Sequence, residues 1–96
     1  MAQVIWTEQA SAELLEIGEY LEEYSEYYAK AWVRKIYARV TNLEKFPYMG
    51  RVVPEIGDKN IRELIEGKYR LIYELLGEDI ILIQKIFHSS RNLDQR

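Results

Sequence analysis

The segment IRELIEGKYRLIYELLGEDIILIQKIFH, residues 61–88, decides the fold of this chain. It holds three apolar runs, at 61–66, 69–76 and 80–88, which are rich in residues that favour strands. The first two runs are separated by Gly67 and Lys68, and a two-residue link that begins with glycine is typical of a β-hairpin. Because another glycine opens the link at 77–79, the segment predicts three consecutive strands.

Two amphipathic helices are predicted before these strands, over residues 7–24 and 26–46. Apolar residues recur at every third or fourth position in both segments, as they do along the buried stripe of a helix. Thr7 and Ser25 stand where N-caps are expected, and Pro47 ends the second helix. We expect the core to contain Leu14, Ile17, Trp32, Ile36, Leu71 and Leu82.

The order of elements predicts an α+β fold. A short strand is expected at residues 4–6, whereas residues 47–60 hold both prolines and are expected to form a surface loop. The resulting order is β-α-α-β-β-β, with the N-terminal helical hairpin packed on one face of a mainly antiparallel sheet. A chain of 96 residues fits one domain, residues 1–96. Since neither a membrane helix nor a secretory signal is recognisable, a cytoplasmic protein is expected.

Charge is unevenly distributed along the chain, whose formal net charge is −3. Residues 1–29 contain seven glutamates and neither lysine nor arginine, whereas residues 30–96 contain all 13 basic residues and nine acidic ones. We interpret the glutamates as a solvated helix face, and no run of basic residues indicates a phosphate-binding patch. The absence of cysteine excludes disulfides, thiol catalysis and thiolate-ligated zinc.

Two arginines interrupt the apolar runs. The two-residue turn places Arg70 opposite Ile65 and places Arg62 opposite Tyr73, on the other face of the sheet. A guanidinium group cannot lose its charge by deprotonation, so each arginine must be paired or solvated. One interpretation is that each side chain extends over its strand neighbours with its head group in water. The other is that one of them binds an anion or a carboxylate of a partner.

A phosphodiester-cleaving site is one hypothesis for the polar residues. It needs a base, an acid and a cation over the phosphate, and Glu55, His88 and Arg70 are the candidates. The alternatives are a structural histidine and a solvated pair of Glu55 with Arg51. A three-residue loop at 77–79 would bring Arg70 and His88 to one face, whereas a two- or four-residue turn would separate them. No metal site or cofactor is expected, since no second histidine is present.

The order and spacing of several segments resemble the RelE/ParE superfamily of toxins from type II toxin–antitoxin modules. The resemblance covers nearly the whole chain. It rests on Trp6-Thr7, Ala12 to Ile17, Tyr20-Leu21, Leu43-Glu44-Lys45-Phe46-Pro47, Gly50-Arg51, Ile61-Arg62-Glu63-Leu64, Tyr69-Arg70-Leu71-Ile72-Tyr73 and His88-Ser89-Ser90-Arg91.

The resemblance implies the same β-α-α-β-β-β fold and a cognate antitoxin whose C-terminal segment wraps the toxin. Candidate partner contacts are Arg62 and Arg70 for the carboxylates of the antitoxin, and Arg91 for the target of a ParE-like toxin. The resemblance also implies one of two targets. ParE-like members poison DNA gyrase without a nuclease site, whereas RelE-like members cleave mRNA on the ribosome, where Arg70, His88 and Glu55 would be catalytic. The acidic pI of about 5.2 favours the ParE-like target, and a homologue that only binds its partner is the third possibility.

Overall fold

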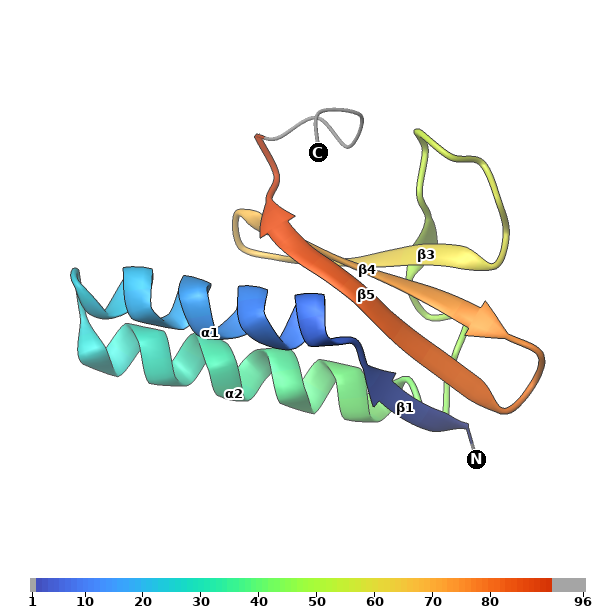
Figure 1. Ribbon diagram of the computed structural model, residues 1–96, viewed down its shortest axis with the longest axis horizontal. Coiled ribbons are helices and arrows are strands. Elements are labelled where there is room, and N and C mark those ends of the chain that lie inside the picture. The colour runs from blue at the N-terminus through green and yellow to red at the C-terminus, as the bar shows by residue number, and fades with distance from the viewer. Residues whose placement is uncertain (1, 91–96) are drawn as a thin grey trace.

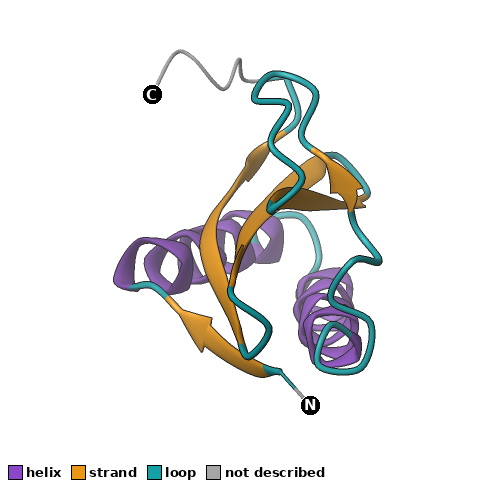
Figure 2. Cartoon of the chain, turned by 90° about the vertical axis from the view of Figure 1, so that its right-hand side faces the viewer, coloured by secondary structure: helices purple, strands orange, loops and turns teal. Residues whose placement is uncertain are grey.

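Two helices precede a sheet of five strands in a computed structural model, which describes residues 2–90. Figure 1 shows the two helices side by side, with the short N-terminal strand at their right-hand end and the three long strands above and to the right. Figure 2 is a view along the longest axis and shows the twist of the strands. The elements are β1 (Gln3–Trp6), α1 (Glu8–Glu22), α2 (Glu26–Asn42), β2 (Arg51–Val52), β3 (Ile61–Glu66), β4 (Tyr69–Leu76) and β5 (Ile80–His88). The predicted α+β order is therefore confirmed.

Both helices begin at the predicted caps. The side chains of Thr7 and Ser25 accept hydrogen bonds from the backbone N–H groups of Ala10 and Tyr28, which satisfies donors that an uncapped helix end leaves free. The second helix ends at Asn42, four residues before the predicted end. Beyond it the chain tightens into turns, in which Leu43, Glu44 and Lys45 each donate to a carbonyl three residues earlier.

The sheet has the strand order β1-β5-β4-β3-β2, in which β1 is parallel to β5 and the other pairs are antiparallel. The β3–β4 hairpin has the predicted two-residue turn, in which Gly67 has a φ of +60°. The two-residue strand β2 lies inside the predicted loop at 47–60, and sequence periodicity cannot reveal so short an element. None of the helices within residues 2–90 is long and apolar enough to cross a membrane.

The main core lies between the helices and one face of the sheet. It joins Leu14, Trp32 and Ile36 from the helices to Leu71 and other strand residues, as predicted. Two predictions for the core need correction. Ile17 is partly buried at the margin of this core. Leu82 lies on β5 between the buried Ile81 and Ile83, so its side chain points to the opposite face of the sheet.

A β-bulge at Gln84 changes the parity of β5. The β4–β5 link is a three-residue loop, since Leu76 pairs with Ile80. Tyr73 pairs with Ile83 and Ile72 with Lys85, however, so Gln84 is an extra residue in this strand. Thr7 lies beside the bulge, and its hydroxyl donates to the Gln84 carbonyl at 3.2 Å.

Gly50 marks a close approach between the loop and the sheet. A Cβ atom at this position would lie 2.5 Å from the Glu63 carbonyl oxygen and 2.6 Å from the Tyr73 hydroxyl, so only glycine fits. The Tyr73 hydroxyl accepts a hydrogen bond from the Gly50 N–H at 2.9 Å and donates to the Pro47 carbonyl at 2.8 Å. Tyr73 therefore anchors the start of the loop to the centre of the sheet.

Candidate functional site

Arg70 lies at the centre of a charged network on the sheet face that points away from the main core. Its side chain is 8% exposed. The two terminal nitrogens donate to the carboxylate of Glu55 at 2.8 and 2.9 Å, and Nε donates to Oε1 of Glu63 at 2.7 Å. Such forked pairing is the strongest geometry available to an arginine and a carboxylate. The guanidinium group is thus shared between two carboxylates of the same chain.

Glu63 is the most buried member of this network, with no exposed side-chain surface. It also accepts a hydrogen bond from Nε of Arg51. A buried carboxylate requires paired cations or hydrogen bonds to offset its lost hydration. Arg51 is in β2, Glu63 in β3 and Arg70 in β4, so the network crosses three neighbouring strands.

Glu55 brings the loop into the network. The Arg70 guanidinium and a backbone hydrogen bond lower the pKa of Glu55 from its ordinary 4.5 to about 2. The group is therefore ionised at neutral pH, and so low a pKa makes it a weak proton acceptor. On the same face of the sheet as Arg70, Val53, Ile72 and Phe87 form a second, smaller core. The charged network and this small core together hold the loop on the sheet.

His88 lies on the opposite face of the sheet from Arg70. It pairs with Tyr69, and the two rings meet edge to face with their centroids 5.4 Å apart. Arg70 instead pairs with Phe87, one position earlier on β5. The three-residue loop alone would bring Arg70 and His88 together, and the bulge at Gln84 reverses that outcome. Nδ1 of His88 lies 2.7 Å from the hydroxyl oxygen of Ser90.

Arg62 lies opposite Tyr73, as predicted, on the face of the sheet that the helices cover. It holds the loop from this face. Its guanidinium group donates to the carbonyls of Lys59 and Gly50, at 2.9 Å each, and lies 4.8 Å from the centre of the Tyr48 ring. Arg91 lies outside the described residues. The structure therefore brings Glu55 and Arg70 together and leaves His88 and Arg62 apart from them.

Neither Glu63 nor Arg51 was predicted to belong to the site. A signal for Glu63 was present in the predicted hairpin register, which puts it opposite Ile72 and therefore diagonal to Arg70. Opposite charges at diagonal positions of an antiparallel pair lie within reach of each other. Arg51 carried no such signal, because the pairing of β2 with β3 was not predictable. Within residues 2–90, no three acidic or histidine side chains gather as a metal site would require.

The helical hairpin packed on a five-stranded mixed sheet makes this an α+β protein, and its similarity to known proteins shows the family. Residues 4–93 match the family model described as the ParE toxin of type II toxin–antitoxin systems, parDE. The curated protein Toxin RelE2 of Caulobacter vibrioides is 28% identical over 91 residues, covering 95% of this chain and 99% of that protein.

A solved structure has a similar fold. It is described as the chromosomal ParDE TA system from P. aeruginosa, with a TM-score of 0.72, 23% identity, and coverage of 92% of this chain and 96% of that chain. The match over residues 4–93 means that the chain belongs to the ParE toxin family, within the RelE/ParE superfamily. It is therefore a toxin of a type II toxin–antitoxin system, and its family implies a cognate antitoxin as partner.

Proposed function

We propose that this toxin is ParE-like, acts on DNA gyrase without a catalytic residue of its own, and is neutralised by its antitoxin. The match to the ParE family model supports this target over the ribosome. The net charge of −3 agrees with it, because a protein that holds RNA phosphates gains affinity from a basic surface.

The observation that carries the proposal is the separation of His88 from Arg70 and Glu55, which are paired with each other. Arg70 is occupied by Glu55 and Glu63, whereas His88 lies on the opposite face of the sheet. A cleavage site needs its acid, base and cation around one phosphate. In the described arrangement, a phosphate would have to displace Glu55 to reach Arg70 and would still not contact His88.

The antitoxin is proposed to contact arginines of the toxin through its carboxylates, with Arg62 and Arg70 as candidates, whereas Arg91 is a candidate contact to gyrase. Arg62 is half-buried and already donates to loop carbonyls. A partner carboxylate reaches Arg70 only by replacing Glu55. We therefore expect Arg62→Ala to weaken toxin–antitoxin binding more than Arg70→Lys does, measured by calorimetric titration with the purified antitoxin.

The target is tested with the purified full-length toxin in two parallel assays. We expect it to inhibit gyrase-dependent supercoiling and to leave mRNA intact on translating ribosomes. His88→Ala should retain gyrase inhibition, because no proton transfer by this residue is involved. Cells that express the toxin should show DNA damage before translation slows.

A RelE-like ribonuclease activity is the second candidate, favoured by the name of the relative Toxin RelE2. In that case, mRNA would be cut on ribosomes, and His88→Ala and Arg70→Ala would each reduce cleavage by about 10²–10⁴-fold. Cleavage abolished by His88→Ala would overturn the gyrase proposal. If neither activity were found and growth were normal on overexpression, a non-toxic binding module would be the remaining function.

A further inference from the structure

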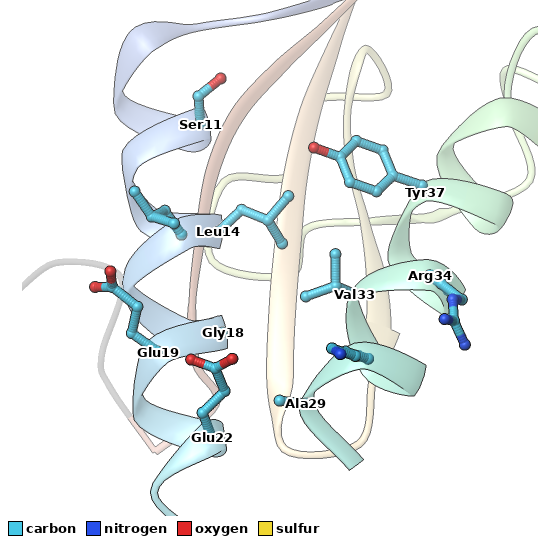
Figure 3. A pocket seen from close by; sticks show the side chains of 11 residues that line it. Ser11, Leu14, Gly18, Glu19, Glu22, Ala29, Val33, Arg34 and Tyr37 are labelled. Atoms are coloured by element: carbon cyan, nitrogen blue, oxygen red, sulfur yellow. The ribbon is translucent and has the colours of Figure 1, made fainter. Parts of the chain in front are cut away.

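An open groove runs between the two helices, away from the charged network. It has a volume of about 410 Å³ and is lined by residues of α1 and α2. Leu14, Gly18, Ala29 and Val33 give it an apolar floor, as Figure 3 shows. Two large apolar side chains on its margins, Leu15 and Tyr37, are 64% and 50% exposed. Burying them on association would be favourable.

The two edges of the groove carry opposite charges. Figure 3 shows Glu19 and Glu22 along the α1 edge and Arg34 along the α2 edge. Lys30, which is also in α2, lines the groove as well. All four are exposed. Among the described residues, no side chain forms an ion pair or hydrogen bond with Glu19, Glu22 or Arg34, and Lys30 has only a solvent-exposed pair with Glu26 at 3.6 Å. The groove is therefore polarised across its width, and most of these charges lack partners.

The antiparallel pairing of the helices puts the opposite charges at neighbouring levels. A Cβ atom on Gly18 would lie 3.6 Å from Cγ2 of Val33, so residues 18 and 33 are at the same level of the groove. Because the helices are antiparallel, each step forward along α1 corresponds to one step back along α2, and the numbers of two level residues sum to about 51. By this count Glu19 is level with residue 32 and Glu22 with residue 29, so Arg34 and Lys30 lie two positions and one position from these levels, about 3 and 1.5 Å along the helix axis. Leu15 is level with residue 36, one position from Tyr37.

We propose that this groove binds the same groove of a second copy of the chain, around a two-fold axis that runs along it. This axis places α1 of one protomer over α2 of the other at the same level. Glu19 then faces Arg34, Glu22 faces Lys30, and Leu15 packs against Tyr37, each contact occurring twice as in any isologous dimer. A two-fold axis across the groove instead places α1 over α1, where the glutamates repel one another. Charge thus selects the first arrangement.

This self-association goes beyond the proposed action on gyrase. Because it is measured with the toxin alone, the result for dimerisation does not depend on the result for gyrase inhibition. The experiment is sedimentation equilibrium of the purified full chain, at concentrations up to about 1 mM so that weak association is detected. Wild type should form dimers. Glu19→Arg and Arg34→Glu should each weaken dimerisation about tenfold, because each replaces two attractive contacts with two repulsive ones.

The decisive measurement is a mixture of the two single variants. In a heterodimer of Glu19→Arg with Arg34→Glu, both 19–34 contacts again join opposite charges, so the mixture should dimerise at least as tightly as wild type. Glu16→Arg is the matched control, because Glu16 is an exposed residue of α1 that does not line the groove, and it should leave the dimer intact. Circular dichroism of each variant tests whether it is folded.

Three results would overturn the proposal. The first is a wild-type chain that remains monomeric over the whole concentration range, which would leave the groove to a different polypeptide such as a partner helix. The second is a dimer that neither single variant weakens, which would put the interface elsewhere on the surface. The third is two weakened single variants whose mixture shows no recovery, because the 19–34 contact would then be absent.

Discussion

The buried carboxylate of Glu63 shows how one residue joins three strands. It accepts hydrogen bonds from Arg51 and Arg70, and its side chain has no exposed surface. Removing one partner from a buried ion pair leaves a charge that is neither hydrated nor paired. In this network, loss of the Glu63 charge would leave two arginines near each other with Glu55 as their remaining acidic neighbour.

We therefore expect Glu63→Gln to lower the free energy of unfolding by about 3–5 kcal/mol, measured by urea denaturation at neutral pH. The matched control is Glu26→Gln, whose partner Lys30 is 60% exposed. This change in an exposed pair should cost less than about 1 kcal/mol. Equal losses in the two variants would show that the network adds nothing to stability beyond a surface ion pair.

At the scale of elements, the helices are stabilised by their caps and by their apolar stripes, and one position in α1 is not optimal. Gly18 lies within this helix and has no positive φ. A Cβ atom there would meet only Cγ2 of Val33, at the ordinary contact distance of 3.6 Å. The backbone therefore accepts alanine without strain, and the cost of glycine in a helix is mainly conformational entropy in the unfolded chain.

Gly18→Ala should raise the free energy of unfolding by about 0.5–1 kcal/mol, measured by urea denaturation in dilute solution, where self-association does not contribute. Gly67→Ala is the opposite control. Its φ of +60° in the β3–β4 turn strains any residue with a Cβ atom, so this variant should be less stable than wild type. A loss of stability in Gly18→Ala would mean that the groove between the helices cannot accommodate a methyl group.

At the scale of the whole molecule, the attachment of the loop to the sheet makes stability depend on pH. The pKa of Glu55 is about 2 when folded, below its ordinary value of 4.5. A carboxylate with a depressed pKa in the folded state contributes stability that is fully present above 4.5 and is lost as the pH falls towards 2. Acid should therefore weaken the attachment of residues 53–60.

This dependence is measured by comparing wild type with Glu55→Gln. The variant should be the less stable protein at pH 7, and the difference should disappear as the pH approaches about 2, where Glu55 of the wild type becomes protonated. Urea midpoints recorded across this range give the comparison. A difference that stays constant from pH 7 to about 2 would contradict the assignment of the low pKa to the Arg70 contact.

Local sequence patterns were sufficient to predict every element except the two-residue β2, and also the pairing of the β3–β4 hairpin. Helical periodicity and the caps at Thr7 and Ser25 are local properties, since they depend on residues three or four positions apart. The two-residue turn at 67–68 fixed the register that puts Arg70 opposite Ile65. The toxin superfamily also followed from the order of segments along the chain.

Most contacts among the polar residues depended on the packing of the whole chain. The bulge at Gln84 places His88 and Arg70 on opposite faces, and its carbonyl accepts a hydrogen bond from Thr7, a residue far away in the sequence. Glu55 reaches Arg70 because the loop folds back over the sheet, which no periodicity describes. Contacts between distant segments are set by the packing of the whole chain, so local sequence patterns do not reveal them.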